Sequence, residues 1–596
     1  VNANEVYEVR KTSDDSLATI YSDAASPTEI VQNGIDNVSG GDGVVEFYIA
    51  DGDYYVEVGG VKSNFGSGAA GIKTDSSGSV QDFINSTEGK LSNFVFASEY
   101  GASLNEAMDA IGIEFAGQRV RIYVDSMMPV TDTVNINIDC DIEATSLSLE
   151  ADILTMFNPV VGWNGSITPC DIWCNNKSLN IGWDLKKELG YVTLNKCRFL
   201  NVGDKLNGTS AEYFIGFLIQ SFGIKKIDIY EPQVIDSYVV PNSVIGDAAG
   251  SNRGIVIEGY VPSDSVISNI NIYNPYTEDM PSEEDSDSIV INLGINSVVG
   301  TEFNIDIYNP SCKNMYRRFI KIIAHELNAT GVRFHGSSVA VGVGVYPHVC
   351  VDISGLVTVE WDGRLSGKGW AQGILVWNGA KLQGSLSASF NMGEESIIEG
   401  TSIRALILLD GDVDICSIDG VGGFELLRVD PDGFLNLERS NHVAYYQSVT
   451  VTGSANIGDY SLSLIDPPSV DVISNPVSRA SQPVIVGASD MFTAASMVAT
   501  QNVDVPLSFM CRISSSSNVT ISKSDSKGFT LAAFRMTSVS NVKVRESKSD
   551  SSYLATFDTG GNNVLFDRCA AGTLGLIANG SPDPATNVTE FGTEPF

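Results

Sequence analysis

Two carboxylates lie two residues apart near the middle of this sequence, at Glu360 and Asp362, and Arg364 follows at the same alternation. In an extended strand, alternate side chains share one face, and two residues of rise separate them by roughly 7 Å. A proton donor and a second carboxylate about 6.5–9.5 Å apart can hydrolyse a glycosidic bond with inversion, and about 5–5.5 Å apart with retention. This spacing therefore points to acid–base cleavage of a glycan.

A third acid, Asp410, ends an apolar run within two repeats of Glu360, and we expect it to supply the opposite carboxylate. Asp352, Glu326 or a residue of a neighbouring subunit are the alternatives. Like charges held close together raise the pKa of one carboxyl group, which a proton donor at neutral pH requires. The chain has no HExxH, GxSxG or phosphate-loop motif, and we expect neither a metal nor a cofactor.

The elements that must position these acids form two interleaved columns of short strands. The first column consists of apolar runs at residues 216–220, 254–258, 288–292, 319–323, 348–352, 373–377, 405–409 and 424–428. The second column follows each run by a few residues, at 227–230, 270–273, 305–308, 332–334, 357–360, 382–386 and 413–415. Two strands at a repeated offset, without crossover helices between them, indicate stacked coils rather than a βαβ sheet.

We therefore predict an all-β fold whose main part is a right-handed parallel β-helix solenoid. One coil cannot bury its apolar side, but stacked coils pair every backbone group and line up a continuous core. A β-sandwich or a propeller, which also contain many short strands, are the alternatives.

The second column predicts a line of outward side chains along the solenoid. If Ile229, Ile272, Ile307, Phe334 and Trp361 face the core, the residues that follow them stack outside. These residues are Tyr230, Tyr273, Tyr308, His335 and Asp362. Aromatic rings with polar neighbours suit sugar rings, so we predict an acidic, aromatic-lined glycan groove, with Arg364 and Trp377 as further substrate contacts. The alternative is that stacked tyrosines only stabilise the solenoid.

Composition narrows the possible partners. The chain has 596 residues, 43% hydrophobic and 18% charged, with 57 glycines and a net charge of −37. Such acidity argues against nucleic acid as a partner, because phosphate contacts need clustered Lys and Arg. The nine cysteines are an odd number, mostly within apolar runs, and predict reduced packing residues. No run is long enough to span a membrane and no secretory signal is visible, so we expect no membrane insertion and release by lysis.

The chain divides into five predicted regions. Residues 1–62 form a small β domain, 63–98 a Gly-rich linker with a short neck helix, and 99–435 the capped β-helix. Residues 436–505 are an irregular connection, because the two columns lose their register there. Residues 506–596 form a narrower β repeat, whose little core favours trimerisation.

Two stretches resemble known families. The residues around 18–58, ending FYIADGDYYVEV, resemble the particle-anchoring domain at the N-terminus of bacteriophage tailspikes and tail fibres. Tyr100-Gly101-Ala102, followed by a helix with a capping-box start at Ser103, resembles the start of tailspikes and pectin-degrading β-helix enzymes. The resemblance implies a homotrimeric virion protein that acts at the bacterial surface, and whose N-terminal domain attaches to the phage tail or to another tailspike.

The residues and the resemblance together lead us to expect a tailspike that hydrolyses O-antigen or capsule polysaccharide as an endoglycosidase. A polysaccharide lyase on the same scaffold is one alternative; it would need a Lys, Arg, His or Tyr base, and acidic polymers would favour a basic groove. A non-enzymatic receptor-binding fibre or adhesin is the other.

Overall fold

The computed structural model describes two compact units, Val1–Phe94 and Val95–Phe596. The residues it describes are 7–11, 20–21, 48–49, 52–58, 61–67, 94–124, 127–168, 170–203, 213–239, 251–260, 265–281, 285–294, 301–343, 349–392, 404–422, 425–445, 447–466, 482–503, 507–571, 575–579 and 586–591. Over these residues the protein is almost entirely β-structure.

Over its described residues, the N-terminal unit contains two small antiparallel sheets. Strand β4 (Gly52–Val58) pairs with β1 (Tyr7–Lys11) and with β5 (Val61–Ser67), and β2 (Ile20–Tyr21) pairs with β3 (Tyr48–Ile49). A small β domain was predicted for residues 1–62, and β5 continues beyond it into the stretch over 63–98 that was predicted to be a linker. The predicted neck helix near Ser79 lies outside the described residues.

A helix closes the start of the second unit. After β6 (Phe94–Phe96) and the 3-10 turn η1 (Ala97–Glu99), helix α2 spans Leu104–Glu114. The predicted capping box is present: the Ser103 hydroxyl accepts the Glu106 amide, and the Glu106 carboxylate accepts the Ser103 amide. Leu104, Met108 and Ile111 are fully buried and cover the open end of the core beside the first strands.

The rest of the unit is one sheet of parallel strands in three columns. The first column holds β9 (Val134–Ile136), β12 (Ile153–Pro159), β15 (Leu179–Leu185), β18 (Tyr213–Gln220), β21 (Ser251–Tyr260), β24 (Asp285–Gly294), β29 (Gln372–Trp377), β31 (Arg404–Leu408), β33 (Glu425–Val429), β35 (Gln447–Val451), β37 (Val484–Gly487), β39 (Phe509–Ser514) and β45 (Gly575–Asn579). The second holds β7 (Val120–Val124), β10 (Cys140–Ala144), β13 (Gly165–Thr168), β16 (Leu189–Asn195), β19 (Ile224–Tyr230), β22 (Asn269–Tyr273), β25 (Glu302–Tyr308), β40 (Val519–Ser522) and β46 (Thr586–Phe591).

The third column holds β8 (Met128–Val130), β11 (Ser146–Leu149), β14 (Cys170–Trp173), β17 (Cys197–Val202), β20 (Gln233–Ser237), β23 (Tyr276–Met280), β26 (Ser311–Met315), β41 (Ser524–Lys527) and β43 (Lys548–Ser549). Longer strands run through more than one column: β27 (Arg318–Gly342), β28 (Val349–Lys368), β30 (Lys381–Asn391), β32 (Asp412–Val421), β34 (Phe434–Ala444), β36 (Ser454–Ile465), β38 (Met491–Asn502), β42 (Ala532–Arg545) and β44 (Tyr553–Asp567). We call one passage through the three columns a rung.

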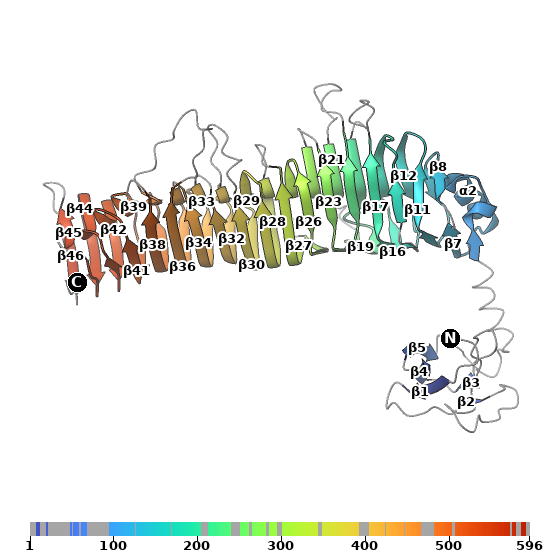
Figure 1. Ribbon diagram of the computed structural model, residues 1–596, viewed down its shortest axis with the longest axis horizontal. Coiled ribbons are helices and arrows are strands. Elements are labelled where there is room, and N and C mark those ends of the chain that lie inside the picture. Colours follow the sequence, from blue (N-terminus) through green and yellow to red (C-terminus); the bar gives the residue numbers. More distant parts are fainter. Residues whose placement is uncertain are drawn as a thin grey trace. The chain divides into compact units, whose positions relative to one another are not determined.

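Every rung pairs in parallel with the rung before and after it, as the succession of strands in Figure 1 shows. In the first column Ile255 pairs with Ile289, Ile289 with Ile320, and the same line continues through Val351 and Ile374 to Leu406. All of these side chains are buried in one continuous core. The predicted register is therefore confirmed, and the all-β parallel sheet is consistent with a β-helix.

The ladder continues where we predicted an irregular connection. Strands β34, β36 and β38 stack in register across residues 434–502, so the prediction for 436–505 is wrong over the described part of that stretch. The strands after residue 506 belong to the same sheet, because β39 pairs with β37 and β40 pairs with β38. The pattern was lost at the sequence level because inward positions there carry small residues such as Ala455 and Ala494.

A buried line of charges crosses the first column. Asp287 lies in β24 with 0% of its side chain exposed. Its Oδ1 atom is 2.9 Å from Nη1 of Arg318. The Nε of Arg318 is 3.3 Å from Asp352 on the next rung, whose other oxygen accepts the Trp377 indole at 2.9 Å. These contacts tie four successive rungs together.

A second buried polar network surrounds His442. The Ser440 hydroxyl donates to the carbonyl of Ile418 at 2.7 Å and lies 2.9 Å from Nε2 of His442, which must therefore donate to it. Nδ1 of His442 faces the Ser448 hydroxyl, which in turn accepts the Tyr460 hydroxyl at 2.7 Å. In the neutral ring Nδ1 accepts the Ser448 hydrogen, whereas protonation would turn Nδ1 into a second donor and take this acceptor away from the Ser448 hydroxyl.

Because His442 is buried, we expect the folded chain to become less stable as the pH falls. Burial lowers the pKa of His442 to about 3 in the folded chain, whereas an unfolded chain binds the same proton near pH 6.5. Below that pH the unfolded state takes up a proton that the folded state excludes. The free energy of unfolding should therefore fall by up to about 1.4 kcal/mol for each pH unit below 6.5.

Urea unfolding followed between about pH 7 and about pH 5 measures this slope. His442→Gln removes the titrating group, so this variant should lose less stability over the same interval than the parent chain does. Equal slopes in the parent chain and His442→Gln would contradict the assignment.

Candidate functional site

The second column places the predicted aromatic residues in one line. Tyr230 pairs with Tyr273, Tyr273 with Tyr308, Tyr308 with His335, and His335 with Asp362. A parallel line lies two residues earlier on the same strands, and consists of Asp228, Asn271, Asp306, Arg333 and Glu360. The residues between the lines, among them Ile229, Ile307 and Trp361, are buried, so both lines face outward.

A repeated corner keeps these strands in register. The second-column strands β16, β19, β22 and β25 are each followed by a residue with a left-handed φ, namely Lys196, Glu231, Asn274 and Asn309 (φ of 52°, 49°, 52° and 48°). The amide of Asn274 donates to the carbonyl of Tyr308 at 2.7 Å, and that of Asn309 donates to the carbonyl of His335 at 2.8 Å. Each corner thus holds the ring-bearing residue of the next rung.

The four rings stack face to face. The centroid distances are 4.7 Å for Tyr230–Tyr273, 4.7 Å for Tyr273–Tyr308 and 4.6 Å for Tyr308–His335, with interplanar angles of 7°, 12° and 21°. Tyr273 and Tyr308 therefore have both faces covered by neighbouring rings. They offer edges and hydroxyl groups to a ligand rather than a flat platform for a sugar ring, which differs from the stacking contact that we expected of them.

Asp306 joins the two lines of side chains. One of its oxygens accepts Nη1 of Arg333 at 3.0 Å, and the other is 2.8 Å from Nε2 of His335. Arg333 also lies 3.7 Å from Glu360 through its Nε atom and 3.8 Å from Glu302. The alternation of the strand, which predicts the line from Tyr230 to Asp362, also predicts Asp306 and Arg333 beside Tyr308 and His335, and the register confirms this placement.

Glu360 and Asp362 lie on the same outward face of β28, on either side of the buried Trp361. The Glu360 side chain is 46% exposed and accepts a long hydrogen bond of 3.4 Å from Gln383. Two residues of strand rise separate their Cα atoms by roughly 7 Å. The carboxyl groups of inverting glycosidases lie about 6.5–9.5 Å apart, a separation that side chains on Cα atoms at this spacing can reach.

The surroundings of Asp362 favour its ionised form. Its Oδ1 accepts the backbone amide of Ser385 at 3.0 Å and the hydroxyl of Ser385 at 2.8 Å. These hydrogen bonds, first the backbone one, lower the pKa of Asp362, and nearby His335 lowers it further. Asp362 is thus suited to act as a base or nucleophile and is not the carboxyl group with a raised pKa that we expected of one member of the pair.

The structure does not bring Asp410 to this pair. Asp410 lies between β31 and β32, at a corner two rungs after β28, where its carboxylate accepts the amide of Asn378. Asp410 thus lies two strand spacings, roughly 10 Å, along the ladder from Glu360, and four residues before the register position of Glu360 on its own rung. That separation exceeds what a pair of glycosidase carboxylates needs.

The remaining predicted contacts occupy different positions. Arg364 is exposed just past the Gly363 corner, beside Asp362. Trp377 ends β29 in the first column and donates to Asp352, which already binds Arg318. Glu326 falls in β27, and its side chain is outside what the structure describes. Near Glu360 the structure therefore places Asp362 and its register partner His335, whereas Arg364 lies beyond the corner and Trp377 and Asp352 lie in the first column.

Over the part of the chain that the structure describes, no cluster of three or more His, Cys, Asp or Glu side chains is arranged to hold a metal ion. Within the same part, no helix has both the length and the apolar composition needed to cross a membrane. Comparison of the chain with known protein families, with curated proteins and with solved structures found no match.

Proposed function

We propose that this chain is a bacteriophage tailspike that binds a bacterial surface polysaccharide, O-antigen or capsule, and hydrolyses it internally at Glu360 and Asp362. In this proposal the ladder is a right-handed parallel β-helix and the chain acts as a homotrimer on the virion. The N-terminal unit attaches it to the phage tail or to another tailspike.

The observation that supports the proposal most is the pair of outward carboxylates over Trp361. The pair lies within two lines of polar side chains that follow the ladder from rung to rung, so a polymer could extend to both sides of it. Hydroxyl groups of Tyr230, Tyr273 and Tyr308 repeat along one of these lines. Such a row of donors and acceptors at regular intervals suits a chain of sugar hydroxyl groups.

The two carboxylates divide the reaction between them. Asp362, held ionised by Ser385, takes a proton from a water molecule whose oxygen bonds to the anomeric carbon. Glu360 gives its proton to the glycosidic oxygen as the bond between that oxygen and the anomeric carbon breaks. The products are a new reducing end of inverted configuration and a free hydroxyl group, as expected for a pair about 7 Å apart.

Product analysis with a panel of purified O-antigens and capsules tests the proposal. A hydrolase releases oligosaccharides with new saturated reducing ends, and proton NMR taken early in the reaction reports inversion at the anomeric carbon. Unsaturated ends would assign a lyase instead. Binding of a polysaccharide without any cleavage would assign an adhesin.

One arrangement favours the lyase as the second candidate. Tyr308 and His335 stack beside Arg333, which provides two possible bases and one cation close to Glu360. A lyase needs such a base together with neutralisation of a uronate carboxylate. Arg333, however, already contacts the carboxylates of Asp306, Glu302 and Glu360, which leaves this surface acidic. We therefore prefer hydrolysis of a polymer that is not rich in uronates.

Trimerisation is a separate expectation. Residues 518, 541 and 563 begin similar runs 23 and 22 residues apart (541 − 518 and 563 − 541), and the resemblance to tailspikes implies that three chains assemble over this region. Light scattering at about micromolar concentration should give the mass of three chains, and removal of residues 440–596 should give one. The mass of a single chain for the full-length protein would contradict a trimer.

The N-terminal unit should be separable from cleavage. Residues up to Phe94 form a unit distinct from the ladder, so deleting residues 1–62 should leave cleavage and trimerisation intact and abolish attachment to the particle. A co-sedimentation assay with particles that lack the spike measures the attachment. Misfolding of the shortened chain, seen as lost cleavage and aggregation, would count against an independent anchor.

A further inference from the structure

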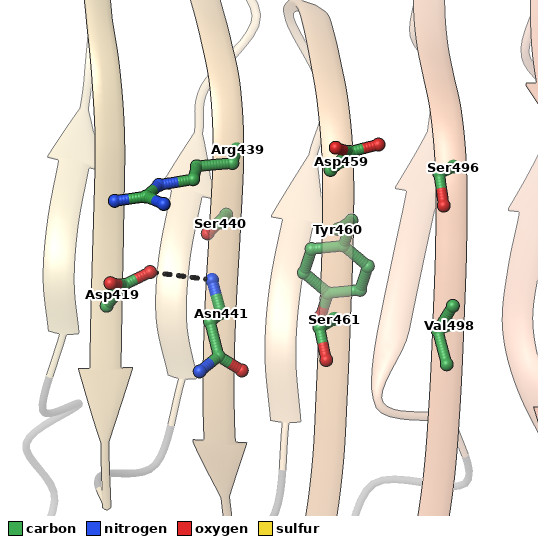
Figure 2. Close-up of a pocket in the computed structure, with 9 residues that line it drawn as sticks. All are labelled: Asp419, Arg439, Ser440, Asn441, Asp459, Tyr460, Ser461, Ser496 and Val498. Atoms are coloured by element: carbon green, nitrogen blue, oxygen red, sulfur yellow. Dashed lines mark hydrogen bonds between the residues drawn. The ribbon is translucent and has the colours of Figure 1, made fainter.

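A hollow of about 440 Å³ opens on the third column, between β32 and β38. Figure 2 shows the side chains that line it, from four successive strands. They are Asp419, Arg439, Ser440, Asn441, Asp459, Tyr460, Ser461, Ser496 and Val498. The hollow has the volume of an ordinary small-ligand site, and the sequence analysis did not identify it.

The register of the strands explains its shape. Asp419, Asn441, Ser461 and Val498 form one line across the four strands, and Arg439, Asp459 and Ser496 form the next. The short side chains of Ser461 and Ser496 leave room between longer neighbours. The floor is rigid, because Ser440 and Tyr460 are nearly buried and are hydrogen-bonded to Ile418 and to Ser448.

Two exposed side chains of opposite charge line the hollow without forming an ion pair. Arg439 and Asp459 are register partners on adjacent strands, yet neither makes a hydrogen bond or an ion pair with any described residue. In Figure 2 the Arg439 guanidinium points away from Asp459, toward β32. Other register partners of opposite charge do pair: Arg198 with Asp171, Arg333 with Asp306 and Lys381 with Asp412.

The remaining polar groups are held in place. The backbone amide of Asn441 donates to Oδ1 of Asp419 at 2.9 Å, which orients that carboxylate at the edge of the hollow. Four planar polar groups line the hollow: the Arg439 guanidinium, the Asp419 and Asp459 carboxylates and the Asn441 side-chain amide. Each of them can form hydrogen bonds with two neighbouring hydroxyl groups, as donor or as acceptor. Val498, which is 37% exposed, supplies an apolar wall.

This combination selects the class of ligand. Adjacent hydroxyls that both donate and accept, on a ring with apolar C–H faces, are the property of a hexopyranose. Two carboxylates against one guanidinium leave the hollow with a net negative charge, in a chain whose net charge is −37. An anionic sugar is therefore disfavoured relative to an uncharged one.

We propose that the hollow binds a neutral hexopyranose residue without cleaving it. Only the identity of the polymer that carries this residue rests on the proposed function. Glu360 on β28 lies two strand spacings before β32, which is roughly 10 Å along the ladder, on the adjoining column. A polysaccharide cut at Glu360 can thus remain attached at the hollow, a few sugar units away from the cut.

Titration with methyl glycosides of glucose, galactose and mannose, followed by saturation-transfer NMR, tests the hollow. Methyl glucuronide is the anionic comparison. We expect one of the neutral glycosides to bind with a dissociation constant on the order of 1 mM or weaker, as ordinary ligand efficiency gives for about a dozen heavy atoms. Binding of the glucuronide alone, or of no glycoside, would overturn the proposal.

Ser461→Tyr fills the hollow from an exposed position and should weaken glycoside binding at least about tenfold, because the new ring occupies the ligand's volume. Ser463→Tyr, two residues further along β36 and outside the lining set, is the matched control and should bind as the parent chain does. Equal binding by both variants would place the ligand elsewhere.

The same variants separate the hollow from the cleavage site. Ser461→Tyr should raise KM for long polysaccharide and leave kcat on short oligosaccharides unchanged. Glu360→Gln should abolish cleavage and leave glycoside binding at the hollow as it is. Glycoside binding without any cleavage by the parent chain would therefore refute the proposed hydrolase and uphold the hollow, whereas cleavage without glycoside binding would do the opposite.

Discussion

Glu360→Gln and Asp362→Asn should each lower the turnover of the cleaved polysaccharide by a factor of about 100 or more, while binding of the polymer stays within a few-fold. Each substitution keeps the size of the side chain and removes a carboxylate. In the proposed reaction Glu360 donates the proton to the leaving oxygen, and Asp362, which Ser385 keeps ionised, activates the water.

The two variants should differ in one respect. External azide can replace the activated water, so it should restore part of the activity of Asp362→Asn. It should restore none of the activity of Glu360→Gln, because an unactivated leaving group still needs a proton donor. Turnover is measured by size-exclusion chromatography of the shortened chains, because the glycosyl azide formed in the rescue has no reducing end, and binding of the intact polymer is measured on the same samples.

Asp414→Asn is the matched control for both variants. Asp414 is an exposed carboxylate of the same outward line, two rungs after Glu360, and it accepts a hydrogen bond of 2.7 Å from Asn436. Its loss should leave turnover nearly unchanged. Near-normal hydrolysis by Glu360→Gln together with Asp362→Asn would move the cleavage site to another surface, such as one shared between subunits.

Asp287→Asn should lower the free energy of unfolding by about 3–5 kcal/mol, the usual loss when one partner of a buried ion pair is removed. Asp287 is fully buried, and its Oδ1 lies 2.9 Å from Arg318, which is itself only 12% exposed. Without the carboxylate, the guanidinium of Arg318 keeps Asp352 as its other ion-pair partner but loses its contact with β24.

The loss is measured by urea unfolding, followed through the fluorescence of the buried tryptophans. Asp414→Asn again provides the comparison, since an exposed carboxylate of the ladder should change stability by less than about 0.5 kcal/mol. A loss of similar size in both variants would show that the Asp287–Arg318 pair contributes little to stability.

Most of the strand register could be predicted from the sequence, and the reason is visible in particular residues. Ile255, Ile289, Ile320 and Leu406 carry the strongest apolar signal because a parallel strand must bury the same positions on every rung. The outward line from Tyr230 to Asp362 followed from the same alternation. Between residues 434 and 502 the signal failed, since Ala455 and Ala494 fill inward positions without being typical strand formers.

The candidate site was less predictable, because it depends on contacts between rungs. That Tyr273 and Tyr308 cover each other's faces follows from side-chain rotamers and the rung spacing, which a residue pattern does not contain. The place of Asp410 depends on how many residues each corner uses. The lowered pKa of Asp362 arises from Ser385, a residue of the next rung at a register irregularity.

The rungs also define how the distance between the two surfaces can change during evolution. Because each rung contacts only its neighbours, gain of one whole rung between β30 and β32 would preserve both sets of side chains, including Ser385 on β30. It would move the hollow relative to Glu360 by one strand spacing, about 4.8 Å. The distance between Glu360 and the hollow can therefore change only by whole strand spacings. A protein built of such rungs can adapt to a polymer of different repeat length by duplicating rungs.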